Sequence, residues 1–234
     1  MILRQLFDHE TYTYLIADEQ FGEALFIDPV LERMPCYRRL LVELGFNLKY
    51  ALDTHVHADH VTALGTLRDE FGCETLVDQH AGVECASRAL QGGEELKMGS
   101  LVFTALYTPG HTSDSICIHL LDGGEDYLFT GDTLFIRGTG RTDFQNGDAG
   151  ALYDSIQRLL CSYPESTWVY PGHDYKGWTI STLGEEKANN PRLQVADKEE
   201  FIALMEVLDL PSPKQMDVAV SANRACGKIE PNPY

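Results

Sequence analysis

The chain has no pair of cysteines at the short spacing of a zinc-binding or redox motif. Its six cysteines are scattered along the sequence, at Cys36, Cys73, Cys85, Cys117, Cys161 and Cys226. This pattern excludes the closely spaced cysteines of a small disulfide-rich domain or of a zinc site made of cysteines alone. In a chain of 234 residues it predicts reduced, mostly buried thiols and a cytoplasmic location.

Long apolar runs and an excess of basic residues are also missing. No run approaches the ~20 residues that cross a membrane, and the N-terminus has neither a basic flank nor the apolar stretch of a secretory signal. The chain has 18 lysines and arginines against 36 acidic residues, a formal net charge of -18. Because this charge repels nucleic acid and anionic membranes, we expect small-molecule partners, which include anions held by local arginines.

What the chain does contain is a dense group of metal-binding residue types, Thr54-His55-Val56-His57-Ala58-Asp59-His60. The group follows the apolar run 48–52, which predicts a buried strand. Imidazoles and carboxylates suit zinc, iron and manganese. A single histidine here would be explained as part of a polar loop, and Asp59 has the alternative role of capping the helix predicted over 61–71. The density of histidines instead predicts a metal centre at a strand end.

Apolar periodicity along the rest of the chain predicts strands and helices in a repeated order. The predicted strands cover 13–16, 24–27, 48–52, 75–77, 101–106, 116–121, 127–129, 168–170 and, as an edge strand, 218–220. The predicted helices cover 35–44, 61–71, 152–160, 182–189 and 198–208. Strands followed by helices, twice over, predict an α/β fold, a four-layered α/β/β/α sandwich. We expect one domain over 1–234, with a short helical and irregular segment from about 180.

Three further ligand candidates each follow a predicted strand. His111 follows the strand 101–106, Asp132 the strand 127–129 and His173 the strand 168–170. Strand ends that meet at one edge of the sandwich can bring such distant residues together. The full set of candidates is His55, His57, Asp59, His60, His111, Asp132 and His173.

These motifs resemble those of the metallo-β-lactamase-fold superfamily. HxHxDH stands at 55–60, GHT at 110–112, the aspartate at Asp132 and GH at 172–173, in the family's order. The resemblance implies a sandwich fold and up to two metals. In the family, the first metal is surrounded by His55, His57 and His111, and the second by Asp59, His60 and His173, with Asp132 shared.

Within this superfamily the chain resembles the persulfide dioxygenases, also called sulfur dioxygenases. The motifs are GRTDFQ at 140–145, YPGHDY at 170–175, NPRL at 190–193 and the closing stretch 210–223. Only about sixty residues follow His173, fewer than the helical extension of glyoxalase II would occupy. The resemblance implies one Fe(II) held by His55, His111 and Asp132. The remaining residues His57, Asp59, His60, His173 and Asp174 would then orient ligands, hold water, or bind a second metal.

The implied reaction converts glutathione persulfide, O2 and water to glutathione and sulfite. Arg141, Tyr175 and Arg192 are the candidates for holding glutathione, because its two carboxylates need fixed donors. The alternative for Arg141 is an ion pair with Asp143, and for Tyr175 simple packing. The block around Cys226 departs from the family pattern, which leaves no predicted role for that cysteine.

Two other functions stay open at this point. The first is a glyoxalase II-type hydrolase of glutathione thioesters with two zinc ions, and the second is a non-catalytic metal-retaining binding or scaffold protein. The sequence also leaves open a homodimer and a separate rhodanese that supplies or consumes the persulfide. No rhodanese-like segment is found in the chain.

Overall fold

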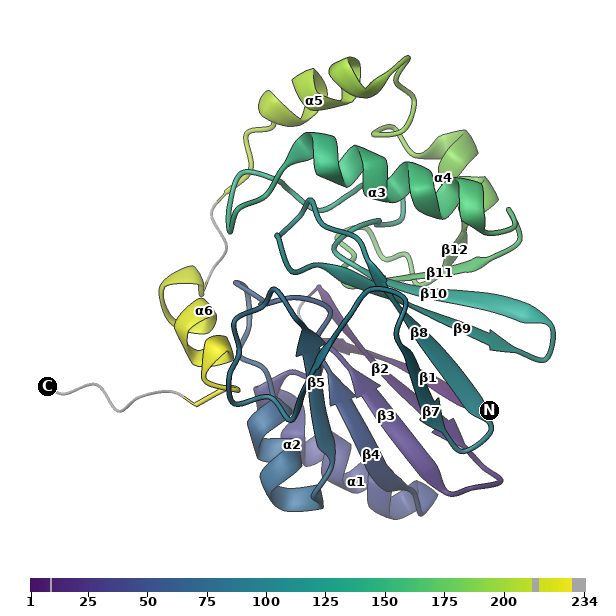
Figure 1. Cartoon of the computed structure of the whole chain (residues 1–234), viewed down its shortest axis with the longest axis vertical. Helices are drawn as coiled ribbons and strands as arrows, with labels where there is room; N and C mark the ends of the chain where they lie inside the picture. Colours follow the sequence, from purple (N-terminus) through teal and green to yellow (C-terminus); the bar gives the residue numbers. More distant parts are fainter. Residues whose placement is uncertain (9, 212–214, 229–234) are drawn as a thin grey trace, which may run out of the picture.

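Two six-stranded β-sheets face each other in the computed structural model, which describes residues 1–8, 10–211 and 215–228 (Figure 1). The first sheet has, in spatial order, the strands β1 (Ile2–Asp8), β2 (Thr11–Asp18), β3 (Glu23–Ile27), β4 (Asn47–Leu52), β5 (Glu74–Asp78) and β6 (Arg88–Leu90). The second has β12 (Ser181–Thr182), β11 (Trp168–Pro171), β10 (Glu125–Gly131), β9 (Ile116–Asp122), β8 (Leu101–Tyr107) and β7 (Glu95–Met98).

Helices cover the outer faces of both sheets (Figure 1). The helical elements are η1 (Leu31–Arg33), α1 (Met34–Leu44), α2 (Leu64–Phe71), α3 (Ala149–Ser162), α4 (Leu183–Asn189), α5 (Lys198–Glu206) and α6 (Met216–Arg224). Helices α1 and α2 pack on the first sheet, and α3, α4 and α5 lie over the second. The four-layered α/β/β/α sandwich predicted from the sequence is confirmed. No helix in the described ranges is both long and apolar enough to cross a membrane.

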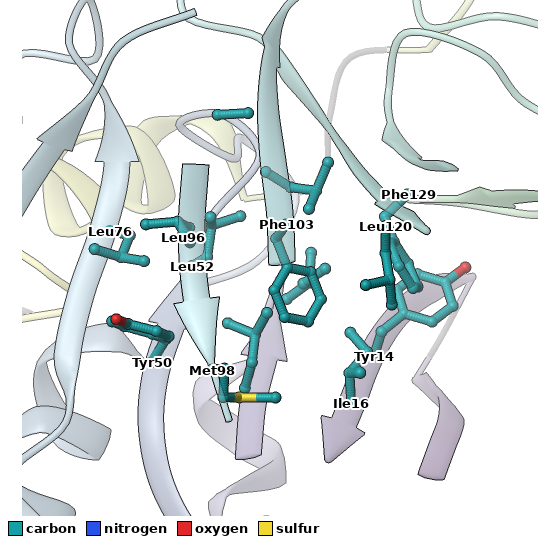
Figure 2. Packing of buried hydrophobic residues seen from close by; sticks show 14 of the residues in the cluster. Tyr14, Ile16, Tyr50, Leu52, Leu76, Leu96, Met98, Phe103, Leu120 and Phe129 are labelled. Atoms are coloured by element: carbon teal, nitrogen blue, oxygen red, sulfur yellow. The ribbon is translucent and has the colours of Figure 1, made fainter. Parts of the chain in front are cut away.

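The core lies between the two sheets and is filled by alternate residues of their strands. Strand β2 is buried along its whole length, because its two faces contact different layers. Tyr14 and Ile16 point into the space between the sheets, where Phe103 and Phe129 pack against them (Figure 2). The intervening Leu15 instead packs in the layer of α1 and α2. Such burial on both faces is what a central strand of a four-layered sandwich requires.

Most of the predicted elements are found, with small shifts at their ends. The predicted strands 13–16 and 24–27 correspond to β2 and β3, which pair antiparallel. Helices α1 and α2 end at Gly45 and Gly72, whose φ angles are 71° and 69°. Glycine adopts this left-handed conformation without the clash that a Cβ would cause, so the glycines end the helices as the sequence predicts.

The edge strand predicted over 218–220 is wrong, because these residues lie within helix α6. Val218 is 48% exposed, whereas Ala219, Ala222 and Asn223 are all buried. Burial at positions i, i+3 and i+4 is the helical pattern, which the short alternation of valines concealed in the sequence. The helix lies against the first sheet's side of the molecule, near α2 (Figure 1).

The prediction of reduced cysteines is also wrong for two of the six. Cys85 and Cys226 form a disulfide across a sequence separation of 141 residues. Cys36, Cys73, Cys117 and Cys161 are free. Sequence spacing gives no information about this pair, because each cysteine lies in a loop or helix end that only the fold brings together.

The start of helix α3 provides a test of the local structure. Asp148 is the N-cap residue, and its Oδ1 accepts a hydrogen bond from the backbone N of Ala151 at 2.7 Å. Replacing Asp148 with alanine removes this acceptor, and we expect it to lower the free energy of unfolding by ~1 kcal/mol. Urea denaturation would measure the loss. The control is Asp148→Asn, which keeps an acceptor and should stay near the wild type; equal losses in both variants would refute the capping role.

Candidate metal centre

The candidate ligands gather at one edge of the sandwich because each follows the end of a strand. His55 to His60 follow β4, His111 follows β8, and Asp132 comes directly after β10. Strands β10 and β11 are parallel, and β9 runs antiparallel to both β8 and β10. The C-terminal ends of β8, β10 and β11 therefore lie at the same edge. A hydrogen bond of 2.9 Å from the Ile116 backbone N to the Thr54 carbonyl joins this edge to the end of β4.

His55, His111 and Asp132 form one compact group. Their nearest ligand atoms all lie within 4.8 Å of one another, and His111 Nε2 is 3.4 Å from Asp132 Oδ2. His111 Nδ1 lies 2.7 Å from the carbonyl oxygen of Arg141. Since a carbonyl can only accept, Nδ1 carries the proton and Nε2 presents its lone pair to the group. This is the orientation that a metal-binding histidine needs.

A second group consists of His57, Asp59 and His60, whose nearest ligand atoms also lie within 4.8 Å of one another. His57 Nε2 contacts Asp28 Oδ1 at 3.1 Å, and His60 Nδ1 contacts Asp59 Oδ2 at 3.0 Å. The other ring nitrogens of His57 and His60 are thus directed away from these carboxylates. Each group of three presents the donor atoms of a metal site, and the two groups together contain six of the seven candidates of the sequence.

The seventh candidate, His173, lies between the two groups. Its Nε2 is 3.6 Å from Asp59 Oδ2 and 3.6 Å from Asp132 Oδ1. Its Nδ1 is 3.1 Å from the carbonyl oxygen of Glu10, which again identifies Nδ1 as the protonated nitrogen. The ring therefore directs Nε2 toward the space between the two carboxylates.

Three buried polar atoms in these groups have no hydrogen-bond partner among the described residues. They are His57 Nδ1, His60 Nε2 and Asp132 Oδ1. Buried polar atoms are almost always satisfied, because an unmade hydrogen bond there costs ~1–3 kcal/mol. Unpaired donors of metal-binding type at the centre of the site fit a bound cation.

Burial sets the protonation of the histidines. It lowers the pKa of both His55 and His57 well below the usual 6.5, so both rings are neutral and able to bind a cation. Burial also acts to lower the pKa of His60, but the adjacent Asp59 carboxylate outweighs it and raises the pKa to about 9. The neutral rings of His55 and His57 can therefore bind a cation directly, whereas the ring of His60 is paired with Asp59.

The carboxylate of Asp28 supports residues 54–62, which we call the ligand loop, from outside the cavity. It accepts hydrogen bonds from the Thr54 backbone N at 2.7 Å, from Thr54 Oγ1 at 2.9 Å and from His57 Nε2 at 3.1 Å. Burial raises the pKa of this carboxyl, although His55 and the two hydrogen bonds from Thr54 act against the rise. Asp28 thus fixes the ring of His57 without itself reaching the cavity.

Two glycines allow the chain to pass close to Asp132. A Cβ on Gly172 would lie 2.6 Å from Asp132 Oδ1. A Cβ on Gly140 would lie 2.1 Å from the Asp132 carbonyl oxygen and 2.9 Å from the ring of His111. These glycines belong to the GH and GRTDFQ motifs. Only a residue without a side chain leaves room there for Asp132 and His111.

The alternative role of Asp59, capping the helix predicted over 61–71, is not found. Helix α2 begins at Leu64 with Ala63 as its N-cap, and the Leu64 backbone N donates to Thr62 Oγ1 at 3.2 Å. Asp59 Oδ2 instead contacts His60 Nδ1 and accepts a hydrogen bond of 3.2 Å from Thr11 Oγ1. The carboxylate of Asp59 therefore faces the metal group and not the helix end.

Two functional residues had no role in the sequence prediction. Asn223 of α6 donates from Nδ2 to the carbonyl oxygens of His57 and His60, at 2.9 and 2.8 Å. Gln145 donates from Nε2 to the carbonyl oxygen of Val56 at 2.7 Å. Both residues lie within motifs of the resemblance, but only the three-dimensional structure shows that they hold the ligand loop.

A cavity of about 1070 Å³ opens above both groups. Its lining includes His55, His111, Asp132 and His173 together with the three predicted glutathione-binding residues Arg141, Tyr175 and Arg192. Tyr175 stacks on His173 with ring centroids 5.9 Å apart and planes 7° from parallel. The cavity therefore brings together all the residues predicted to bind substrate and those predicted to bind iron.

The two arginines in this lining differ in what surrounds them. The Arg141 guanidinium makes two hydrogen bonds to Asp143, at 2.6 and 2.7 Å, and two more to the carbonyl oxygens of Leu210 and Pro211. Arg192 is half-buried, and within the described chain its guanidinium makes one side-chain hydrogen bond, to Met205 Sδ at 3.5 Å, and no ion pair. Burial lowers the pKa of Arg192. A desolvated guanidinium without a carboxylate is costly unless a ligand supplies one.

Asp174 does not contact His173 as an acceptor. Its Oδ2 accepts hydrogen bonds from the backbone N atoms of Lys176, Gly177 and Trp178. These bonds shape the turn that carries Tyr175 over the cavity. The carboxylate of Asp174 therefore fixes the turn that follows it, and acts on the candidate metal ligands only indirectly.

Comparison with known proteins gives consistent matches. The family model of the metallo-beta-lactamase superfamily matches residues 7–179. A Mus musculus protein named persulfide dioxygenase ETHE1, mitochondrial, is 42% identical over 99% of this chain and 91% of its own length. The crystal structure of ETHE1 from Myxococcus xanthus is 52% identical, covers 97% of this chain and 100% of its own, and superimposes with a TM-score of 0.93.

A hydrolase is more distant. A Schizosaccharomyces pombe protein named probable hydroxyacylglutathione hydrolase is 33% identical over 81% of this chain and 85% of its own length. Both the identity and the share of this chain that is covered are lower than for the mouse dioxygenase. The comparison therefore favours the persulfide dioxygenase over the glyoxalase II-type hydrolase.

Proposed function

This chain belongs to the metallo-beta-lactamase superfamily and, within it, to the persulfide dioxygenases, and from that premise we propose that it oxidises glutathione persulfide at a single Fe(II). The chain is an enzyme, so the non-catalytic function considered from the sequence is not supported. The proposed reaction takes glutathione persulfide, O2 and water to glutathione, sulfite and two protons. Two parts of this reaction are our proposal: that the metal is iron, and that the thiol carrying the persulfide sulfur is glutathione.

The observation that supports iron is the group of His55, His111 and Asp132. Two imidazoles and one carboxylate, with their nearest donor atoms within 4.8 Å, form the donor set of non-haem Fe(II) oxygenases. Such a set leaves coordination positions free for substrate and oxygen. The group also lines the cavity, so a substrate that enters meets these three residues.

Bound Fe(II) would supply a place where the terminal sulfur and O2 meet and exchange electrons. The protein's own residues do the positioning. Arg141 holds the ring of His111 through its carbonyl oxygen, and the stacked ring of Tyr175 limits how His173 can turn. Burial acts to lower the pKa of His173, but the carboxylates of Asp132 and Asp59 outweigh it and raise the pKa, so the ring can hold one of the protons that the reaction releases.

Recognition of glutathione would use cations in a protein of net charge -18. Arg192 offers the cavity a guanidinium that no described carboxylate neutralises, which matches a substrate carboxylate. Arg141 has most of its donors engaged by Asp143 and by the chain at Leu210 and Pro211. We therefore assign the main electrostatic contact to Arg192, and to Arg141 mainly the shaping of the cavity wall.

One observation favours a second function, a glyoxalase II-type hydrolase with two zinc ions. The unpaired His57 Nδ1 and His60 Nε2 could hold a second cation beside Asp59. Against it, the hydrolase relative is less similar than the dioxygenases. In the proposed enzyme, His57, Asp59 and His60 instead surround the iron ligands and hold water.

Oxygen consumption separates the two functions. With glutathione persulfide under an oxygen electrode, the proposed enzyme consumes one O2 for each sulfite formed. S-lactoylglutathione, a thioester, should cause no oxygen uptake and no release of free thiol. Thioester cleavage without oxygen uptake would instead establish the hydrolase.

The cytoplasmic location and the partners remain part of this proposal. The mouse relative is named as mitochondrial. We propose that the present chain acts in the cytoplasm, with a separate rhodanese and a second copy of the chain as partners. Fractionation followed by size-exclusion chromatography would test the location and the homodimer.

A further inference from the structure

Helix α6 holds the loop of the candidate metal ligands through one buried side chain. Asn223 is 2% exposed. Its Nδ2 donates to the carbonyl oxygens of His57 and His60, and its Oδ1 accepts a hydrogen bond of 2.8 Å from the Thr62 backbone N. One amide thus satisfies three backbone groups of the ligand loop, which its length and two-sided polarity allow.

The residues after α6 pack against the same loop. The Gly65 backbone N donates to the carbonyl oxygen of Cys226 at 3.0 Å. A Cβ on Gly227 would lie 2.0 Å from the carbonyl oxygen of Thr62, so backbone contacts backbone there. Any movement of Cys226 and Gly227 away from the loop would therefore carry Asn223 with it.

The Cys85–Cys226 disulfide is a covalent cross-link between this segment and the loop before β6. Cys85 lies between β5 and β6, and Cys226 lies three residues after Asn223. Apart from the polypeptide chain itself and this disulfide, residues 215–228 are held to the rest of the molecule by noncovalent contacts.

We propose that Asn223 is a positioning residue for the metal centre and that the Cys85–Cys226 disulfide keeps it in place, so that reduction of this bond weakens the hold on the metal. The inference rests on the proposed function only in requiring a metal in the site. It adds a redox control that acts through the shape of the ligand loop and not through the cavity.

The chemistry needs only thiols as the reductant. A thiolate attacks Sγ of Cys85, which is half-buried, whereas Cys226 is 1% exposed. The sulfur–sulfur bond breaks, the Cys226 thiolate leaves and takes up a proton, and a mixed disulfide forms at Cys85. A second thiolate releases Cys85 as a thiol, so two thiols are oxidised to one disulfide as the protein gains two thiol groups.

Metal release from the intact holoenzyme tests the proposal without measuring turnover. The oxidised protein and the protein reduced with a phosphine are each mixed, without oxygen, with an excess of an Fe(II) chelator. We expect reduction to speed iron release about 10- to 100-fold, the range for lost outer support of a ligand. If the site holds zinc instead, a zinc chelator gives the same comparison, so failure of the proposed function would not hide the result.

Three variants separate the disulfide from other thiols. Cys85→Ser and Cys226→Ser should each release metal at the rate of the reduced wild type and show no response to the phosphine. Cys161→Ser, which removes an exposed free cysteine, should behave as the wild type. Equal release from the oxidised and reduced wild type would overturn the proposal, as would alkylation of all six cysteines without reductant.

Hydrogen exchange of the apoprotein tests the role of Asn223 itself. Asn223→Asp keeps an acceptor for the Thr62 N–H but loses the donors to His57 and His60. We expect Thr62 to stay protected in Asn223→Asp while its holoprotein releases metal faster, and to lose protection in Asn223→Ala. Ser221→Ala, on the same helix with its Oγ bonded only to Val218, is the control. Uniform loss of protection across α6 in Asn223→Asp would show a merely structural role and refute the assignment.

Discussion

Replacing Asp132 with alanine should abolish both metal binding and persulfide-dependent oxygen uptake. Asp132 supplies the one carboxylate of the group with His55 and His111, and its Oδ1 is buried without a hydrogen-bond partner in the described structure. Loss of an outer group that orients a ligand costs ~10–100-fold in metal affinity or activity, and loss of the ligand itself should cost more. Metal content of the purified variant and its oxygen uptake would measure the two losses.

The matched control for this variant is Asp126→Ala. Asp126 lies on the same strand, β10, and contacts His119 Nε2 at 2.7 Å, away from the candidate ligands. It should retain both metal and oxygen uptake. The assignment of Asp132 as a ligand would be wrong if Asp132→Ala bound metal as well as Asp126→Ala did.

Replacing Arg192 with alanine should raise the KM for glutathione persulfide about 10- to 100-fold and change kcat little. A hydrogen bond to a charged group contributes ~1.5–3 kcal/mol, and each ~1.4 kcal/mol is a factor of ten. The effect falls on KM because the carboxylate of the substrate is remote from the reacting sulfur and is bound equally in the ground and transition states. Steady-state kinetics with oxygen in excess would measure it.

Two further variants show whether the charge or the shape of Arg192 matters. Arg192→Lys keeps the charge but loses the two-pronged geometry, and should fall between wild type and alanine. Arg158→Ala, at an arginine of α3 that contacts the Tyr107 carbonyl outside the cavity lining, is the control and should leave KM unchanged. An unaltered KM in Arg192→Ala would return the anchoring role to Arg141.

The sequence predicts those parts of the site that depend on residues close to one another in the chain. His55 to His60 are contiguous, and their place at the end of a strand follows from the apolar run before them. Asp132 and His173 could be placed because each follows a strand directly or within two residues. Parallel strands then bring these ends together whatever the intervening sequence is, which explains why the sequence predicts both the fold and the ligand group.

The parts that the sequence does not predict depend on contacts between distant residues. Asn223 is 166 positions from His57, and Cys85 is 141 from Cys226. Neither pairing has a local pattern, and the sequence predicts a strand in place of α6 because two valines alternate around one alanine. The ion pair of Arg141 with Asp143 was a local alternative that the sequence did contain, and the structure has it.

The metal content of protein purified without oxygen tests the central claim most directly. A single-iron dioxygenase predicts one iron per chain, lost in Asp132→Ala, with His57, Asp59 and His60 holding no cation. Two zinc ions per chain, shared by both groups of ligands in the active protein, would contradict it.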